Sequence, residues 1–156
     1  MRVPENVYLA VSLSRLTIEE NSVWVQWKND SGMQAADFGV AVFPPKNAER
    51  FFSLVNAVGR KGIILFGAQT AQVFFNEKNS KKSDWIGNWM AHSMLPGIPI
   101  YCIPHPSEYL ALKGKYKEQD RLHAKVVSYL RMFRNLCVIS DKATLTAAVT
   151  DFGDSQ

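Results

Sequence analysis

The sequence contains no apolar run that approaches the roughly 18 residues needed for a membrane-spanning helix. Its first residues, 1–5, also lack the continuous apolar stretch of a secretion signal. No low-complexity tract or internal repeat is visible, which argues against a repeat architecture. We therefore expect a cytoplasmic protein with no membrane partner.

Cysteine is scarce as well, with only Cys102 and Cys137 in the chain. Cys102 lies in an apolar, strand-like run and Cys137 follows a helix-like segment, and their spacing does not indicate a metal site. His92 and His123 have no ligand-like partner in the sequence, so we assign them no role. We expect two reduced core cysteines, no metal and no cofactor.

The amino-acid composition is typical of a globular protein, with 47% hydrophobic and 21% charged residues. A length of 156 residues corresponds to about one domain and can bury a core without disulfide or metal staples. We predict a single α/β domain over residues 1–150 and a loose tail over residues 151–156.

The net charge of +4 is concentrated in one stretch, because residues 105–137 hold seven basic and three acidic residues. The rest of the chain sums to zero. Such a concentration favours a polyanionic partner such as DNA, and a solvated basic helix face is the alternative.

The chain before Pro44 is rich in β-forming residues. Residues 7–13 fit strand alternation, although Leu9, Leu13 and Leu16 also fit a helical stripe, and we favour the strand. Alternation at residues 23–27 and a β-rich run at 38–43 lead us to predict two or three strands before Pro44.

After Pro44 the pattern alternates between helices and strands. Asn47 is predicted to cap a short helix that ends near residues 59–62. The continuous apolar run 63–66 is typical of a strand buried on both faces, and Gly67 marks its turn into a helix over 68–75.

The remaining elements complete this alternation. Residues 76–97 are polar and irregular, residues 98–103 form another strand, and residues 120–135 form a helix with one apolar face. We expect residues 62–66 and 98–103 to be neighbouring parallel strands whose carboxyl ends share a cleft.

Two segments stand at those strand ends: Leu65-Phe66-Gly67-Ala68-Gln69-Thr70-Ala71-Gln72 and Ile103-Pro104-His105-Pro106-Ser107. In this order they resemble the C-terminal half of the uracil-DNA glycosylase superfamily. In that family one strand ends in a Leu-Trp-Gly-Ala-x-Ala-Gln-like turn and the next ends in His-Pro-Ser, followed by a loop and a final helix. The resemblance covers residues 62–137. It implies a three-layer α/β sandwich with a largely parallel central sheet and a shortened N-terminal part.

The resemblance also implies a protein that binds DNA or a nucleobase, and excision of a damaged or modified base if the site is active. His105 would contact the base carbonyl and stabilise the negative charge that develops as the glycosidic bond breaks. A donor of this kind in a dry pocket lowers a barrier by about 3–4 kcal/mol. Ser107 would contact a phosphate, and Gly67 and Gln69 belong to the same DNA- or base-binding set.

The segment Glu108–Lys117 follows His-Pro-Ser, where the family places the loop that probes the duplex while a base is flipped out. Tyr109 or Leu110 is the predicted wedge. Phosphate anchors are predicted at Lys113, Lys115 and Lys117.

One family motif has no counterpart here: the Gly-x-x-Pro segment after the first strand, which carries or neighbours the water-activating acid. Asp37 is our candidate for that acid, and Asp30 is a weaker one. Residue 108 is glutamate where the commonest form of the motif continues with proline.

Two alternatives stay open: a catalytically silent DNA-binding accessory or protein-interaction module, and an enzyme acting on a free nucleotide or nucleoside. An acid missing from the pocket of His105 would favour the silent module.

Overall fold

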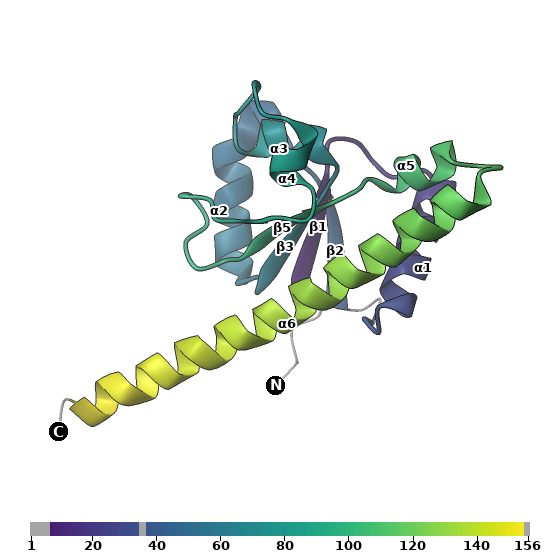
Figure 1. Cartoon of the computed structure of the whole chain (residues 1–156). Helices are drawn as coiled ribbons and strands as arrows, with labels where there is room; N and C mark the ends of the chain where they lie inside the picture. Colours follow the sequence, from purple (N-terminus) through teal and green to yellow (C-terminus); the bar gives the residue numbers. More distant parts are fainter. Residues whose placement is uncertain (1–6, 35–36, 155–156) are drawn as a thin grey trace.

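A five-stranded sheet in the order β2-β1-β3-β5-β4 forms the middle layer of the protein (Figure 1). The computed structural model describes residues 7–34 and 37–154, with side chains in the last helix described as far as Cys137. All neighbouring strands pair in parallel except β4, which runs antiparallel to β5. The strands are β1 (Tyr8–Ser12), β2 (Phe38–Val42), β3 (Gly62–Phe66), β4 (Trp89–Met90) and β5 (Ile100–Ile103).

Helices cover both faces of this sheet, so the predicted three-layer α/β arrangement with a largely parallel sheet is confirmed. Helices α2, α3 and α4 contribute to the core on one face, and α1, α5 and α6 cover the other (Figure 1). The helices are α1 (Ile18–Asp30), α2 (Ala48–Val58), α3 (Ala68–Phe74), α4 (Lys82–Trp85), α5 (Pro106–Ala111) and α6 (Tyr116–Asp154), and a 3₁₀ turn, Pro45–Asn47, precedes α2.

Alternation along the strands divides the core into two layers. In β3, Ile63 and Leu65 pack with the phenylalanines of α2 and α3, whereas Ile64 and Phe66 pack with Trp24 on the opposite face. Every residue of β3 is buried, which explains why its sequence is a continuous apolar run. Full burial of an aliphatic or phenyl side chain contributes about 1.5–3 kcal/mol, so this central strand anchors both layers.

Helix α1 replaces the strand predicted at residues 23–27, and that prediction was wrong. Thr17 and Glu20 form a capping box: the Thr17 hydroxyl accepts the Glu20 N–H at 3.1 Å, and Glu20 Oε1 accepts the Thr17 N–H at 2.8 Å. Val23, Trp24 and Trp27 then face the core at helical spacing. Burial of this stripe overrides the β propensity of the valines.

The other predicted elements agree with the structure at β1, β2, β3, β5, α2 and α3. Asn47 occupies the position before α2, but its side chain makes no capping hydrogen bond. The stretch predicted as irregular, residues 76–97, contains the short elements α4 and β4. Along the described part of the chain, no helix has the length and apolar character required to span a membrane.

Helix α6 is much longer than the predicted helix and runs past the edge of the body (Figure 1). It packs on the sheet through Val126, Leu130 and Phe133. Residues 151–154 are helical where we expected a loose tail, and residues 155–156 lie outside the described residues.

Several basic side chains of α6 bind the C-terminal end of α1. His123 Nε2 lies 2.7 Å from a carboxylate oxygen of Asp30. Arg131 and Arg134 donate to the carbonyl oxygens of Asp30 and Gly32, each at 3.4 Å. Cationic groups at the C-terminal end of a helix also interact favourably with its dipole. Two of the seven basic residues in this stretch therefore have a structural use.

Candidate functional site

A cavity of about 450 Å³ lies at the carboxyl ends of β1, β3 and β5. The chain passes from β1 to β2 on one side and then crosses to β3 on the other, so the space between β1 and β3 is a topological switch point. Open α/β sheets bind their ligands at such points. As predicted, Gly67 and His105 meet there, because β3 and β5 are parallel neighbours and the Gly67 N–H donates to the Ile103 carbonyl at 2.7 Å.

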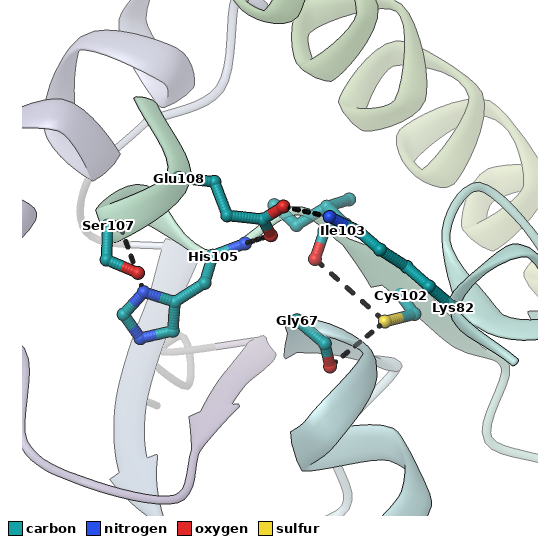
Figure 2. Close-up of polar contacts among 7 residues, drawn as sticks. All are labelled: Gly67, Lys82, Cys102, Ile103, His105, Ser107 and Glu108. Carbon is teal, nitrogen blue, oxygen red and sulfur yellow. Dashed lines mark hydrogen bonds and ion pairs between the residues drawn. The ribbon is translucent and has the colours of Figure 1, made fainter. Parts of the chain in front are cut away.

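His105 is held as the N-cap of α5 (Figure 2). Its Nδ1 accepts the Ser107 backbone N–H at 3.0 Å, and its own backbone N–H donates to Glu108 Oε2 at 2.9 Å. Pro106 occupies the first turn, where its fixed φ suits the helix and no N–H is needed. The sequence His-Pro-Ser-Glu is therefore a complete capping unit that fixes the imidazole against the cavity.

The imidazole of His105 is neutral at pH 7, because burial lowers its pKa from the ordinary value of 6.5, although Glu20 and Glu108 partly offset this effect. Since Nδ1 accepts a hydrogen bond, the proton of the neutral ring is on Nε2. In Figure 2 the second ring nitrogen lies on the side away from Ser107. His105 thus presents one N–H donor to a ligand.

Glu20 is an acidic side chain at this cavity that the sequence pattern did not reveal. It lines the same cavity as His105, and its Oε2 lies 3.9 Å from His105 Nδ1. The two side chains are only 16% and 21% exposed, so solvent screens their interaction weakly. The available signal was the capping box that Thr17 and Glu20 form just after β1. It predicts a helix whose first turn lies at the carboxyl edge of the sheet.

Glu108 links His105 to Lys82 across the cavity (Figure 2). One carboxylate oxygen accepts the His105 backbone N–H, and the other is hydrogen-bonded to the Lys82 ammonium group. Lys82 belongs to α4 and is 63% exposed, so this contact joins α4 to α5 at the rim. The glutamate that departs from the family motif therefore has a defined structural partner.

Gly67 and Gln69 both line the cavity, as expected for members of the predicted site. Gln69 is exposed in the first turn of α3. Cys102 donates to the Gly67 carbonyl at a sulfur–oxygen distance of 3.4 Å, and burial raises the pKa of this thiol to about 12. Cys102 is thus a protonated core thiol and not a nucleophile.

The structure separates Asp37 from the site. Asp37 directly precedes β2, at the opposite end of the sheet from His105, and borders a different hollow with Tyr8 and Arg134. The candidate acid Asp30 is bonded to His123 at the C-terminal end of α1. Neither aspartate can act together with His105, and their assignment as candidate acids was wrong.

The predicted duplex-probing loop is mostly helical, since α5 extends to Ala111 and α6 begins at Tyr116. Tyr109 and Leu110 pack against the core, with the Tyr109 ring 6.2 Å from that of Trp27. Both side chains are partly buried in this packing, and the wedge role stays a prediction.

Ser107 lines the cavity with its backbone N–H bonded to His105, whereas the three lysines surround the turn beyond α5. Helix α5 has six residues, so that turn lies about 9 Å from the N-terminal end of α5 along the helix axis. All three lysines are exposed: Lys113, Lys115 and Lys117.

No three His, Cys, Asp or Glu side chains gather into a metal centre within residues 7–34 and 37–137, whose side chains are described. No protein-family model matches the chain, and no curated protein matches it significantly. The cavity and the residues that line it are therefore the basis for assigning a function.

Proposed function

We propose that this cavity binds a nucleobase and that the protein hydrolyses the N-glycosidic bond of a damaged or modified nucleotide in DNA. One observation carries the proposal: the neutral imidazole of His105 and the carboxylate of Glu20 line the same cavity, 3.9 Å apart. The resemblance of residues 62–137 to the uracil-DNA glycosylase superfamily supports the same chemistry.

The two side chains have complementary roles in this reaction. The Nε2–H of His105 donates to a carbonyl oxygen of the base and stabilises the charge that develops as the bond to C1′ breaks, an effect of about 3–4 kcal/mol. Glu20 orients the attacking water and accepts its proton. Glu20 lies after β1, where the resembling family carries the segment of its acid, and so takes the role first considered for Asp37.

DNA would reach the cavity by way of the lysines beyond α5. Lys113, Lys115 and Lys117 are exposed. Arg131 and Arg134 are exposed as well, but their guanidinium groups donate to backbone carbonyls at the C-terminal end of α1. Phosphates bound at this turn would position the duplex without reading its sequence. The base alone would enter the cavity, as in enzymes that flip their target out of the stack.

A second candidate is a catalytically silent module that keeps the fold and binds DNA or a protein. The observation in its favour is that Glu20 and Glu108 each complete a capping box, so both carboxylates also have a purely structural use. The acid that we required for activity is nevertheless present beside His105, and for this reason we favour the enzyme.

The test measures abasic-site formation in single- and double-stranded oligonucleotides that carry uracil or another modified base. We expect His105→Ala to reduce excision by about 100-fold or more while DNA binding is retained. Glu20→Gln should reduce excision comparably, since the amide can still accept the Thr17 N–H but cannot accept a proton. Glu19→Gln is the matched control, because Glu19 is an exposed carboxylate in the same first turn.

Retained DNA binding without excision of any base would overturn the enzyme proposal and support the silent module. Excision that survives both His105→Ala and Glu20→Gln would show that the chemistry occurs elsewhere.

A further inference from the structure

We propose that the base accepted by this cavity carries a fixed positive charge on its ring together with a carbonyl group, as in an N7-alkylated guanine, and that neutral uracil is a poor substrate. This inference rests on the proposed function and names the substrate class of the same site. It follows from the charges that line the cavity and from the contacts that each of them makes.

The lining carries two carboxylates, Glu20 and Glu108, and one ammonium group, Lys82. Lys82 is hydrogen-bonded to Glu108, so these two charges compensate each other. His105 adds no charge, because its Nδ1 lone pair accepts the Ser107 N–H. The charge that remains is the single negative charge of Glu20.

The oxygens of Glu20 differ in their surroundings. Oε1 accepts the Thr17 N–H at 2.8 Å, whereas Oε2 has no hydrogen-bond donor among the described residues. The nearest ring atom, His105 Nδ1, lies 3.9 Å away and is itself an acceptor. Glu20 lines the cavity and its Oε2 faces an acceptor atom, so a cationic ligand would supply this oxygen with the positive charge that its described neighbours do not.

The two groups together define a ligand. His105 offers an Nε2–H donor that can bind a carbonyl oxygen, and Glu20 offers a negatively charged carboxylate that attracts a cationic ring. A volume of about 450 Å³ lies within the range typical of small-molecule sites, so the cavity has room for a purine. An N7-alkylated guanine presents both features on one flat ring.

The reaction balances with water as the only co-reactant. The bond between C1′ and the ring nitrogen breaks, and its electron pair stays with the ring, which thereby loses its positive charge and leaves as a neutral base. The water oxygen bonds to C1′, and its proton passes to the Glu20 carboxylate and then to solvent. Uracil would instead leave as an anion, which the Glu20 charge would oppose.

The experiment compares 7-methylguanosine with guanosine, which differ in one methyl group and one charge. Binding of both nucleosides is followed by NMR titration at the same pH, and the lowered pKa of the buried His105 imidazole favours its neutral form. We expect the wild type to bind 7-methylguanosine at least about tenfold more tightly, because the Glu20 carboxylate attracts the positive charge of the methylated ring.

Three variants locate the origin of this preference. Glu20→Gln should remove it, and Glu19→Gln should leave it unchanged. Lys82→Met should strengthen it, because Glu108 then adds an uncompensated negative charge to the cavity. Circular dichroism identifies any variant that does not fold, and in that case Glu20→Asp, which keeps the charge, should preserve the preference for the cation.

Equal binding of the two nucleosides, or a preference that persists in Glu20→Gln, would overturn this inference. Excision of uracil in preference to 7-methylguanine from matched oligonucleotides would also overturn it but would leave the proposed function intact. If the protein neither binds a nucleoside nor excises any base, the proposed function itself fails, and this inference fails with it.

Discussion

Gly67 and His105 meet so closely across the ends of β3 and β5 that a Cβ atom on Gly67 would lie 3.3 Å from the Cβ of His105. Gly67 also has φ +88°, a region that side-chain-bearing residues rarely adopt. The turn from β3 into α3 therefore requires glycine for two reasons. It brings α3 to the cavity and leaves space for the histidine cap of α5.

Gly67→Ala should destabilise the protein by about 1–3 kcal/mol and shift the His105 ring resonances in NMR spectra. Gly114→Ala is the matched control, since Gly114 also has positive φ (+89°) but a Cβ atom there would meet nothing within 4 Å. Chemical denaturation measures the loss of stability in both variants. If Gly114→Ala disturbs the His105 resonances as much as Gly67→Ala does, the close contact is not responsible.

Glu108→Ala should cost about 0.5–2 kcal/mol, because it removes the acceptor of the His105 backbone N–H. Lys82→Met should cost less than about 1 kcal/mol, because the lysine side chain is 63% exposed and exposed ion pairs contribute little. Glu108→Gln, which keeps an acceptor oxygen, should be close to Lys82→Met in stability. Urea unfolding of the three variants ranks them, and an equal loss in Lys82→Met and Glu108→Ala would contradict the assignment.

Acidification should destabilise the fold through His92 and His105. Burial lowers the pKa of both imidazoles below 6.5, so the folded state binds fewer protons than the unfolded state. The free energy of unfolding should therefore fall as the pH decreases from about 6.5 and level off below the folded pKa values. His92 Nδ1 also accepts the Met94 N–H, a bond that protonation removes.

The variant His92→Phe, which keeps an aromatic ring beside Phe52, should show a weaker decrease between pH ~7.5 and ~5.5. The stability of this variant at neutral pH measures the cost of losing the hydrogen bond from the Met94 N–H, so that the pH-dependent effect can be separated from it. An unchanged pH dependence would mean that His92 does not titrate differently in the folded and unfolded states.

Association with DNA should weaken as salt rises if the proposed function is correct. Replacing Lys113, Lys115 and Lys117 with glutamine should flatten the slope of log K against log salt by about 2.7 on duplex DNA, the contribution of three phosphate contacts. Replacing Lys46 and Arg50 is the control, because these exposed residues lie on the other face, in the 3₁₀ turn before α2 and in the first turn of α2. Fluorescence anisotropy gives the slopes, and equal effects of both sets would indicate non-specific attraction only.

The sequence permitted prediction of elements whose signals are local. Residues 63–66 form a continuous apolar run because β3 is buried on both faces, and Gly67 marks the turn into α3. The same reasoning failed at α1, because Val23 and Val25 favour a strand locally while Trp24 and Trp27 are buried at helical spacing. The length of helix α6 was underestimated, since the apolar stripe used to predict it, Leu122, Val126, Leu130 and Phe133, lies in its first half.

Site residues that follow adjacent parallel strands could be predicted from the sequence. Residues that reach the cavity only through the packing of a distant helix could not. His105 and Gly67 follow adjacent strands, so their proximity was predictable from the parallel-sheet rule. Glu20 reaches the cavity only because α1 begins beside the end of β1, and this depends on the capping box that was overlooked. Asp37 was chosen by residue type alone, and the direction of β2 places it at the wrong end of the sheet.

Helix α1 has Glu20 in its first turn and Asp30 as its last residue, roughly 15 Å apart along the axis of this 13-residue helix. Its far end is fastened to α6 through His123, Arg131 and Arg134. Both ends of α1 are therefore held by side-chain contacts, the first turn by the Thr17–Glu20 capping box and the last by α6. The orientation of the Glu20 carboxylate toward the cavity is thus fixed by a helix that is anchored on α6, more than one turn away from the residues that line the site.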